Sequence, residues 1–222
     1  MGGLNIATYN VGRGLVHKLE SIFARAKQVN IDILALQEIS DDVLDHSLCA
    51  SFGYDGIVYD NKLNAGVALL VQHSIVPLIR QRLINNSGRI CGLTLQLQQH
   101  IATIMCVYCP TGLDWTPALS TQSSANNWLP SKDANDNDNE DEDEVVDDRN
   151  NQSILRKRHN CCMKIYDEIR KWQAGGDYCI LMGDFNETRD DIDISDSSSR
   201  LHHSGKYINT LIDEGYEDTC PT

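Results

Sequence analysis

The 222-residue chain lacks the features that mark secreted and membrane proteins. No basic segment and no long apolar core follow Met1, so the sequence predicts an intracellular protein with no signal peptide and no transmembrane segment. Without a secretory context, its eight cysteines are expected to be reduced thiols. Cys106 and Cys109 have the spacing of half a zinc site, but no second pair matches them, and strand positions three apart point to opposite faces. These absences argue against a disulfide scaffold and against a zinc module.

The chain also lacks an obvious basic face, which sequence-independent DNA-binding proteins usually have. Its net charge is −13, but ten of the 32 acidic residues lie in residues 133–148, which contain no basic residue. The other 22 acidic residues face 19 basic ones, so the remainder is nearly neutral. One basic group, Arg156-Lys157-Arg158, stands on a predicted helix. Charge therefore neither supports nor excludes a polyanionic substrate.

The acidic run belongs to a longer stretch, about 120–151, that is rich in Ser, Asn, Asp and Glu. Like charges at this density repel, and the stretch cannot bury enough apolar surface to order itself. We expect a disordered insertion in a surface loop of a single domain that spans residues 1–222. A calcium site is disfavoured because the glycine and terminal glutamate of an EF-hand loop are missing. Mimicry of nucleic acid, shielding a groove, is a further alternative.

Against these absences, the sequence contains apolar runs that each lead to a polar side chain. Residues 4–8 alternate apolar and polar, as a half-buried strand does, and lead to Asn10. Residues 32–36 form a second run that leads to Glu38, and apolar spacings of three and four over 15–26 predict an amphipathic helix between them. Because strand–helix–strand units favour parallel neighbours, Asn10 and Glu38 are expected at one edge of a sheet, where ligand sites of α/β sheets collect.

A third apolar run, residues 179–182, predicts a buried strand that ends at Asp184 and Asn186. Side chains two apart on a strand share a side, so these two are expected to project together. A helix over 154–174 leads into this strand, and Gly175-Gly176 is expected to end the helix as a C-cap. One face of that helix comprises Ile154, Arg158, Cys161, Cys162, Ile165, Ile169 and Trp172.

A fourth run, residues 101–107, predicts a strand that is followed by Tyr108 and Pro110. Proline cannot pair in a ladder and favours extended geometry before it, so the chain is expected to leave the sheet here. Tyr108 would then be able to donate its phenol to a phosphate oxygen, although a tyrosine of the core or rim is the simpler interpretation of this residue alone. A short helix over 204–215 is expected downstream.

Together these side chains suit a divalent metal beside a phosphoester. Mg²⁺ prefers oxygen ligands and often takes only one or two protein carboxylates, so Glu38 is the natural ligand, with Mn²⁺ as an alternative ion. Asn10 and Asn186 can hydrogen-bond phosphate or orient water, and Asp184 can position or deprotonate the attacking water. Taken singly, each residue is better explained as a turn or solvated residue. Taken together, they favour the functional interpretation.

Five short motifs stand in register with these predicted strands. They are residues 8–11 (Thr-Tyr-Asn-Val), 36–38 (Leu-Gln-Glu), 66–71 (Gly-Val-Ala-Leu-Leu-Val), 107–110 (Val-Tyr-Cys-Pro) and 183–186 (Gly-Asp-Phe-Asn). In this order they resemble the endonuclease/exonuclease/phosphatase superfamily, which includes DNase I, exonuclease III-type abasic-site endonucleases and the endonuclease domains of non-LTR retrotransposons. The resemblance runs from Leu4 to about Thr219, apart from the acidic insertion.

The resemblance implies a four-layer αββα sandwich, in which two β-sheets pack face to face with helices outside. It also implies metal-dependent phosphodiester cleavage. We expect endonucleolytic cleavage of nucleic acid, of DNA rather than RNA, with no membrane and no obligate protein partner. By the same resemblance Glu38 is the metal ligand and Asp184 orients the nucleophilic water. Asn10, Tyr108 and Asn186 are then contacts of the phosphate or of the metal site.

The chain departs from the family after the Gly-Asp-Phe-Asn motif. Family members continue with two more strands and a closing Ser-Asp-His, whose histidine is a general base or phosphate contact, and no Ser-Asp-His occurs here. His202 and His203 lie in a Ser/Asp-rich loop and are expected to be solvated. We expect a domain that lacks its final strands and has weak activity, because general acid–base help is worth about 10²–10⁴-fold. The alternatives are a phosphatase for inositol lipids or another small phosphoester, and a catalytically dead remnant or binding module.

Overall fold

Two four-stranded β-sheets form the centre of the protein, whose structure is a computed structural model. The structure describes residues 3–12, 15–39, 44–62, 65–110, 148–187 and 206–217. Most of the insertion predicted at about 120–151 lies outside the described residues, and so do His202 and His203. Within the described ranges, no helix is long and apolar enough to cross a membrane.

The first sheet has the strand order β1-β2-β4-β3. β1 (Ile6–Asn10) and β2 (Ile33–Gln37) run parallel and are connected through α1 (Leu15–Gln28), so the predicted strand–helix–strand unit is confirmed. β3 (Tyr54–Lys62) and β4 (Ala65–Gln72) complete the sheet as an antiparallel pair, with β4 antiparallel to β2. The parallel pair brings the carboxyl ends of β1 and β2 to the same end of the sheet.

The second sheet has the strand order β5-β6-β7-β8. β5 (Ile79–Ile84), β6 (Ile90–Leu97) and β7 (His100–Tyr108) are antiparallel neighbours, whereas β8 (Tyr178–Asp184) runs parallel to β7. The helix α3 (Asp148–Gln173) precedes β8. Residues 148–151, which were predicted to belong to the insertion, are therefore helical. Acidic residues are favourable at a helix N-terminus, where the macrodipole is positive, and this lets the helix begin inside the acidic run.

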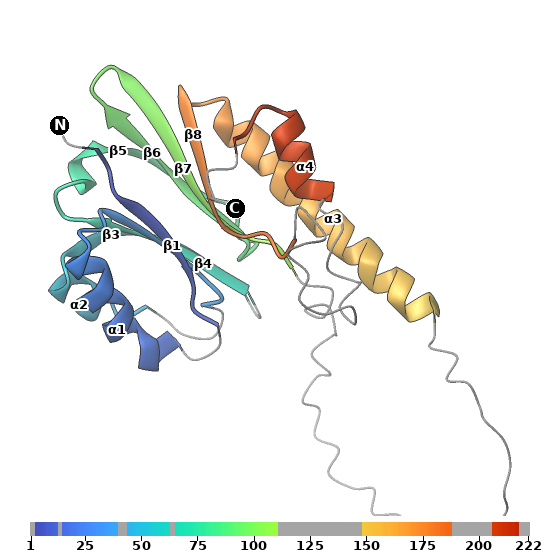
Figure 1. Ribbon diagram of the computed structural model, residues 1–222, viewed down its shortest axis with the longest axis horizontal. Coiled ribbons are helices and arrows are strands. Elements are labelled where there is room, and N and C mark those ends of the chain that lie inside the picture. The colour runs from blue at the N-terminus through green and yellow to red at the C-terminus, as the bar shows by residue number, and fades with distance from the viewer. Residues whose placement is uncertain are drawn as a thin grey trace, which may run out of the picture.

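Helices cover the outer face of each sheet, which gives the protein four layers (Figure 1). α1 and α2 (His46–Ser51) pack on the first sheet, and α3 and α4 (Lys206–Asp213) pack on the second. A single 3₁₀ turn, Val76–Leu78, links β4 of one sheet to β5 of the other. The predicted αββα sandwich is confirmed.

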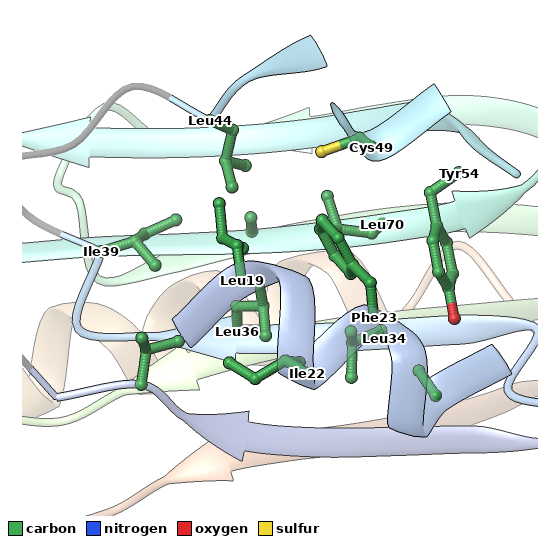
Figure 2. Packing of buried hydrophobic residues seen from close by; sticks show 13 residues of the cluster. Leu19, Ile22, Phe23, Leu34, Leu36, Ile39, Leu44, Cys49, Tyr54 and Leu70 are labelled. Atoms are coloured by element: carbon green, nitrogen blue, oxygen red, sulfur yellow. The ribbon is translucent and has the colours of Figure 1, made fainter. Parts of the chain in front are cut away.

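The core beneath α1 explains why β2 is apolar at almost every position. Leu34 and Leu36 face α1, whereas Ile33 and Ala35 face the second sheet. A strand that is buried on both faces offers no position to a solvated side chain, so its sequence is a continuous apolar run. Figure 2 shows the helix side of this core, in which Leu19, Ile22 and Phe23 of α1 pack against Leu34, Leu36 and Leu70.

A buried glutamine joins the two sheets behind the ends of their strands. Gln37 is the last residue of β2 and is 1% exposed. Its Nε2 donates to Thr8 Oγ1 of β1 and to Cys106 Sγ of β7, each at 3.0 Å. Cys106 thus belongs to the core between the sheets, while Cys109 belongs to the core under α3, so the two thiols face opposite sides as predicted. The seven described cysteines are free.

The end of α3 differs from the prediction. The helix packs on the second sheet through buried Ile165 and Ile169, but it ends at Gln173, and neither Gly175 nor Gly176 has the left-handed φ of a glycine C-cap. Gly176 is required for another reason, because a Cβ there would lie 2.7 Å from Thr103 Oγ1. The glycine pair therefore permits a close approach between the turn and β7.

Candidate active site

Polar side chains from four strand ends, two in each sheet, meet at one end of the sandwich. Asn10 is the last residue of β1, and Glu38 follows β2. Tyr108 ends β7 and Asp184 ends β8, and these two are register partners in the second sheet. Because β1 is parallel to β2 and β7 is parallel to β8, both pairs of carboxyl ends fall together. All four were predicted as site residues from the sequence.

One amide nitrogen connects the two sheets at this place. Asn10 Nδ2 donates to Glu38 Oε1 at 3.0 Å and to Asp184 Oδ2 at 2.7 Å. Asn10 Oδ1 accepts from the backbone N–H of Gly12 at 2.9 Å, which orients the carboxamide. The two carboxylates therefore lie within two hydrogen-bond lengths of each other. Their mutual repulsion would be relieved by a cation placed between them.

Tyr108 holds the same carboxylate from the second sheet. Its hydroxyl donates to Glu38 Oε1 at 3.1 Å, so this oxygen accepts two hydrogen bonds. Tyr108 itself is only 4% exposed. Glu38 Oε2 makes no hydrogen bond within the described residues and faces Gly12, where a Cβ would lie 4.0 Å from it. One oxygen of Glu38 is thus fixed by the protein and the other is open to a ligand.

Left-handed backbone conformations occur just after β2 and just after β8. Glu38 has φ 60° and Asn186 has φ 49°, values that residues other than glycine rarely adopt. Such strain costs about 1–3 kcal/mol per residue and persists where the surrounding structure imposes it, often at functional sites. At Glu38 the turn ends β2 and carries the next residue, Ile39, to the edge of β4, where its N–H bonds Gly66 O.

Asn186 is placed differently from the prediction. It lies beyond the end of β8 in a left-handed conformation, so the rule that strand side chains two apart share a side does not apply to it. Its Nδ2 donates to Cys109 O at 2.6 Å, and its backbone N–H donates to Asp184 Oδ1 at 2.9 Å. Asn186 therefore reaches the Asp184 carboxylate through its backbone, and its side chain ties β8 to the end of β7.

The glycine of the Gly-Asp-Phe-Asn motif has a steric reason. Gly183 has φ 149°, and a Cβ on it would lie 1.9 Å from Val107 O and 2.9 Å from Val107 N. No side chain fits between the two backbones at this distance. Gly183 therefore allows β8 to approach β7 closely enough for Asp184 to stand beside Tyr108.

Two cations near these residues were not predicted as site residues. Lys18 of α1 donates its Nζ to Val11 O at 2.6 Å, and a Cβ on Gly12 would lie 3.6 Å from that nitrogen. The same Cβ would also lie 4.0 Å from Glu38 Oε2, so Lys18 Nζ and this oxygen both border Gly12. The helical spacing of α1 indicates an exposed lysine but carries no signal for this contact.

The second cation is Arg89, which lies under the tyrosine ring. Its guanidinium carbon is 4.7 Å from the ring centroid of Tyr108, and its carbonyl accepts the Tyr108 N–H at 2.8 Å. Arg89 is 7% exposed, and such a desolvated cation–π contact is worth about 2 kcal/mol. In the sequence it is one arginine just before an apolar run, with nothing to indicate its partner.

The thiol beside the site is not a nucleophile. A hydrogen bond with Cys162, together with burial, holds the pKa of Cys109 well above its ordinary value, so Cys109 remains protonated near neutral pH. The same hydrogen bond lowers the pKa of Cys162, helped by the positive charge of Arg158. Cys109 therefore does not supply a thiolate nucleophile to the site near neutral pH.

The donor set fits a sparsely ligated oxygen-binding cation. Among the described residues there is no group of three or more His, Cys, Asp and Glu side chains that could enclose a metal. Glu38 and Asp184 are nevertheless two adjacent carboxylates, and Mg²⁺ often binds through one or two carboxylates while it keeps several waters. Soft ligands are absent from the pair, which disfavours zinc.

Comparison with known proteins places this geometry in context. A family model described as the endonuclease/exonuclease/phosphatase family matches residues 7–222. No curated protein matches the chain. Among the solved structures that are similar to the chain, two illustrate the shared fold. The first is the 3′ phosphatase NExo from Neisseria bound to product DNA hairpin, with a TM-score of 0.64 and 17% identity over 96% of this chain and 72% of that one. The second is an AP endonuclease from Archaeoglobus fulgidus, with a TM-score of 0.60 and 15% identity over 97% of this chain and 72% of that one.

Proposed function

Since the chain belongs to the endonuclease/exonuclease/phosphatase family, we propose that it hydrolyses phosphodiester bonds of nucleic acid with the help of a divalent cation. The observation that carries this proposal is the meeting of Asn10, Glu38, Tyr108 and Asp184 at one end of both sheets. Two carboxylates, a carboxamide and a phenol in hydrogen-bond contact are the groups that water attack on a phosphoester requires.

Each side chain has a role that follows from its contacts. Glu38 is the proposed metal ligand, because one of its oxygens is fixed by Tyr108 and Asn10 while Oε2 is open. A bound Mg²⁺ or Mn²⁺ would supply positive charge against the phosphate and lower the pKa of water. Asp184 accepts the Asn186 N–H at Oδ1. It is the group that orients the attacking water and accepts a proton from that water.

The remaining polar groups bind the phosphate. The Asn10 amide and the Tyr108 hydroxyl are neutral donors that bond Glu38, and both can turn from the carboxylates toward phosphate oxygens. Lys18, which donates to Val11 O beside the end of β1, adds a cation to this side of the site. Asn186 holds the ends of β7 and β8 together and so contributes to the site through the backbone.

DNA is the proposed substrate. The two similar structures are a phosphatase with product DNA and an AP endonuclease, which supports a deoxyribose phosphate backbone as the class of ligand. The described histidines on strands and turns are engaged elsewhere, for example His73 with Asp55 and His100 with Asp177. Among the described residues no group of three or more His, Cys, Asp and Glu side chains could enclose a metal, which favours a second candidate, a nucleic-acid-binding domain without catalysis.

A nicking experiment on supercoiled plasmid separates these candidates. With Mg²⁺ the protein should convert supercoiled to open-circular DNA, and EDTA should abolish the conversion. Glu38→Ala and Asp184→Ala should remove it, while Glu20→Ala, an exposed acidic residue of α1, should not. DNA retention without any nicking at high protein concentration would favour the binding domain. Release of phosphate from an inositol phosphate without nicking would instead favour the small-phosphoester phosphatase.

A further inference from the structure

Arg158 of α3 is buried, whereas its neighbours in sequence are exposed. The residue is 5% exposed, and Arg156 and Lys157 lie in solvent. A helix on the outer face of a sheet can present arginine to water at no cost, and a buried guanidinium must be compensated by charge and hydrogen bonds. The reason for burying Arg158 lies in what it contacts.

Arg158 contacts Asn186, the last residue of the Gly-Asp-Phe-Asn motif, and Glu187, the residue after it. Its Nη2 donates to Asn186 O at 2.8 Å and lies 3.7 Å from Glu187 Oε1. The Glu187 side chain is 1% exposed, so the ion pair is closed to water. Glu187 Oε2 also accepts the Ile208 N–H, in the first turn of α4, at 3.1 Å. Helix α3, helix α4 and the segment that follows β8 thus meet at this ion pair.

Asn186 is held at both of its backbone polar groups. Its carbonyl accepts from Arg158, and its N–H donates to Asp184 Oδ1 at 2.9 Å. Between these contacts the residue keeps the left-handed φ of 49°. Released from either contact, an asparagine would gain by relaxing to a common backbone conformation, and the N–H would then leave the Asp184 carboxylate.

We propose that Arg158 is a positioning residue for Asp184, acting through the backbone of Asn186. With Oδ1 fixed by Asn186, only Oδ2 of Asp184 is turned toward Asn10 and the open side of the site. Glu187 keeps the guanidinium at the Asn186 carbonyl. This inference rests on the proposed function, since the orientation of Asp184 matters for rate only if Asp184 handles the attacking water.

A purely structural role makes a different prediction from a positioning role. Buried ion pairs can often be replaced by apolar side chains of similar volume without loss of stability. The double variant Arg158→Met/Glu187→Leu should therefore fold while leaving the Asn186 carbonyl without its donor. Arg158→Lys keeps the charge but replaces the planar guanidinium, whose Nη2 serves both acceptors, with an ammonium group of different geometry. Arg156→Lys, the same change on the exposed side of α3, is the matched control.

The first readout is Mg²⁺-dependent nicking of plasmid under single-turnover conditions. We expect the double variant and Arg158→Lys to lose about ten- to a hundred-fold in maximal rate with the half-saturating protein concentration unchanged, because misplaced groups slow chemistry more than binding. Guanidinium ion should partly restore Arg158→Ala, and Arg156→Lys should match the wild type. A folded double variant with the wild-type rate would overturn the inference.

The second readout does not depend on activity. Hydrogen exchange of the Asn186 amide should speed up by at least about ten-fold in the double variant, while that of Ile104 in the core of β7 should not change. Unchanged exchange at Asn186 would also overturn the inference. If the wild type nicks nothing while Asn186 exchange responds as expected, the proposed function fails and the positioning contact stands.

Discussion

The two sheets supply the same kind of side chain to the site but hold it in different ways. In the first sheet, Asn10 and Glu38 stand at the surface, and the group behind them is the neutral amide of Gln37. In the second sheet, Tyr108 and Asp184 are backed by buried arginines, Arg89 directly under the tyrosine and Arg158 behind Asn186. The hydrogen bonds to the Asn10 and Glu38 side chains thus come from neutral donors.

The second half is held by charged groups, and this difference between the two sheets has a consequence for function. Buried charged groups interact strongly because little water screens them, so Arg89 and the ion pair of Arg158 with Glu187 hold the ends of β7 and β8 in place. Exposed groups such as Asn10 can rearrange when a ligand arrives. The comparison therefore assigns rigidity to the second sheet and adaptability to the first, and it can be tested on matched positions.

The largest expected effect comes from removing one carboxylate charge in each half. Glu38→Gln and Asp184→Asn should each lower the nicking rate by about 10²–10³-fold, because the proposed reaction needs both the proposed metal ligand and the proposed proton acceptor. Both variants should be at least as stable as the wild type in urea denaturation, since repulsion between the two carboxylates is relieved. Full activity in either variant would show that one sheet alone carries the chemistry.

The next largest effect is on stability, and it compares Gly183, which precedes Asp184, with Gly12, which lies two residues after Asn10. Gly183→Ala should lower the free energy of unfolding by about 3 kcal/mol, because its Cβ would overlap Val107 O. Gly12→Ala, at φ 62° but with its nearest neighbour 3.6 Å from the Cβ, should cost only about 1 kcal/mol. Urea denaturation measures both. Equal costs would remove the steric distinction between the two halves.

The third prediction tests whether the charge of Arg89 stabilises the second half through its contact with the Tyr108 ring. A double-mutant cycle with Arg89→Met and Tyr108→Leu should give a coupling energy of about 2 kcal/mol, since the cation lies over the ring away from water. Thermal or urea unfolding of the four proteins provides the measurement. A coupling energy near zero would mean that Arg89 fills space without using its charge.

The smallest expected effect is a pH dependence in the first half. Burial, with Asp45 nearby, raises the pKa of Cys49 from 9.0 to about 11. A raised pKa means that the folded state favours the protonated thiol, so this stabilisation is complete below pH 9 and is lost as the pH rises toward 11. At pH 10 the wild type should have lost about 1 kcal/mol that Cys49→Ala does not lose, as measured by urea denaturation.

A wild type that loses no more stability than Cys49→Ala between pH 8 and pH 10 would contradict this raised pKa.

Much of the fold could be predicted because its strands and helices follow the spacing of apolar residues along the sequence. The runs 32–36 and 179–182 are short and continuous, and the helix between the first two strands follows a regular spacing. The parallel pairing of β1 and β2 follows from that order alone. The meeting of Asn10 with Glu38 was predicted in this way, and the structure brings Tyr108 and Asp184 to them.

The rest depends on contacts between distant parts of the chain. The left-handed turns at Glu38 and Asn186 are imposed by their neighbours in space, so period-two reasoning misplaced the Asn186 side chain. Arg158 falls on the apolar face of the predicted helix, yet as one of three consecutive basic residues it also resembled part of a solvated basic group. Only its position against Asn186 and Glu187 decides between the two interpretations.

The hydrogen bond from Asn10 to Asp184 also has a consequence for synthesis of the protein. It joins residues 174 positions apart, so this contact closes the longest loop at the site. At a translation rate of about 5–20 residues per second, the ribosome completes β1 and β2 many seconds before β8 emerges. Until then the nascent chain carries Asn10 and Glu38 without Asp184. The candidate site is therefore incomplete until synthesis has passed β8.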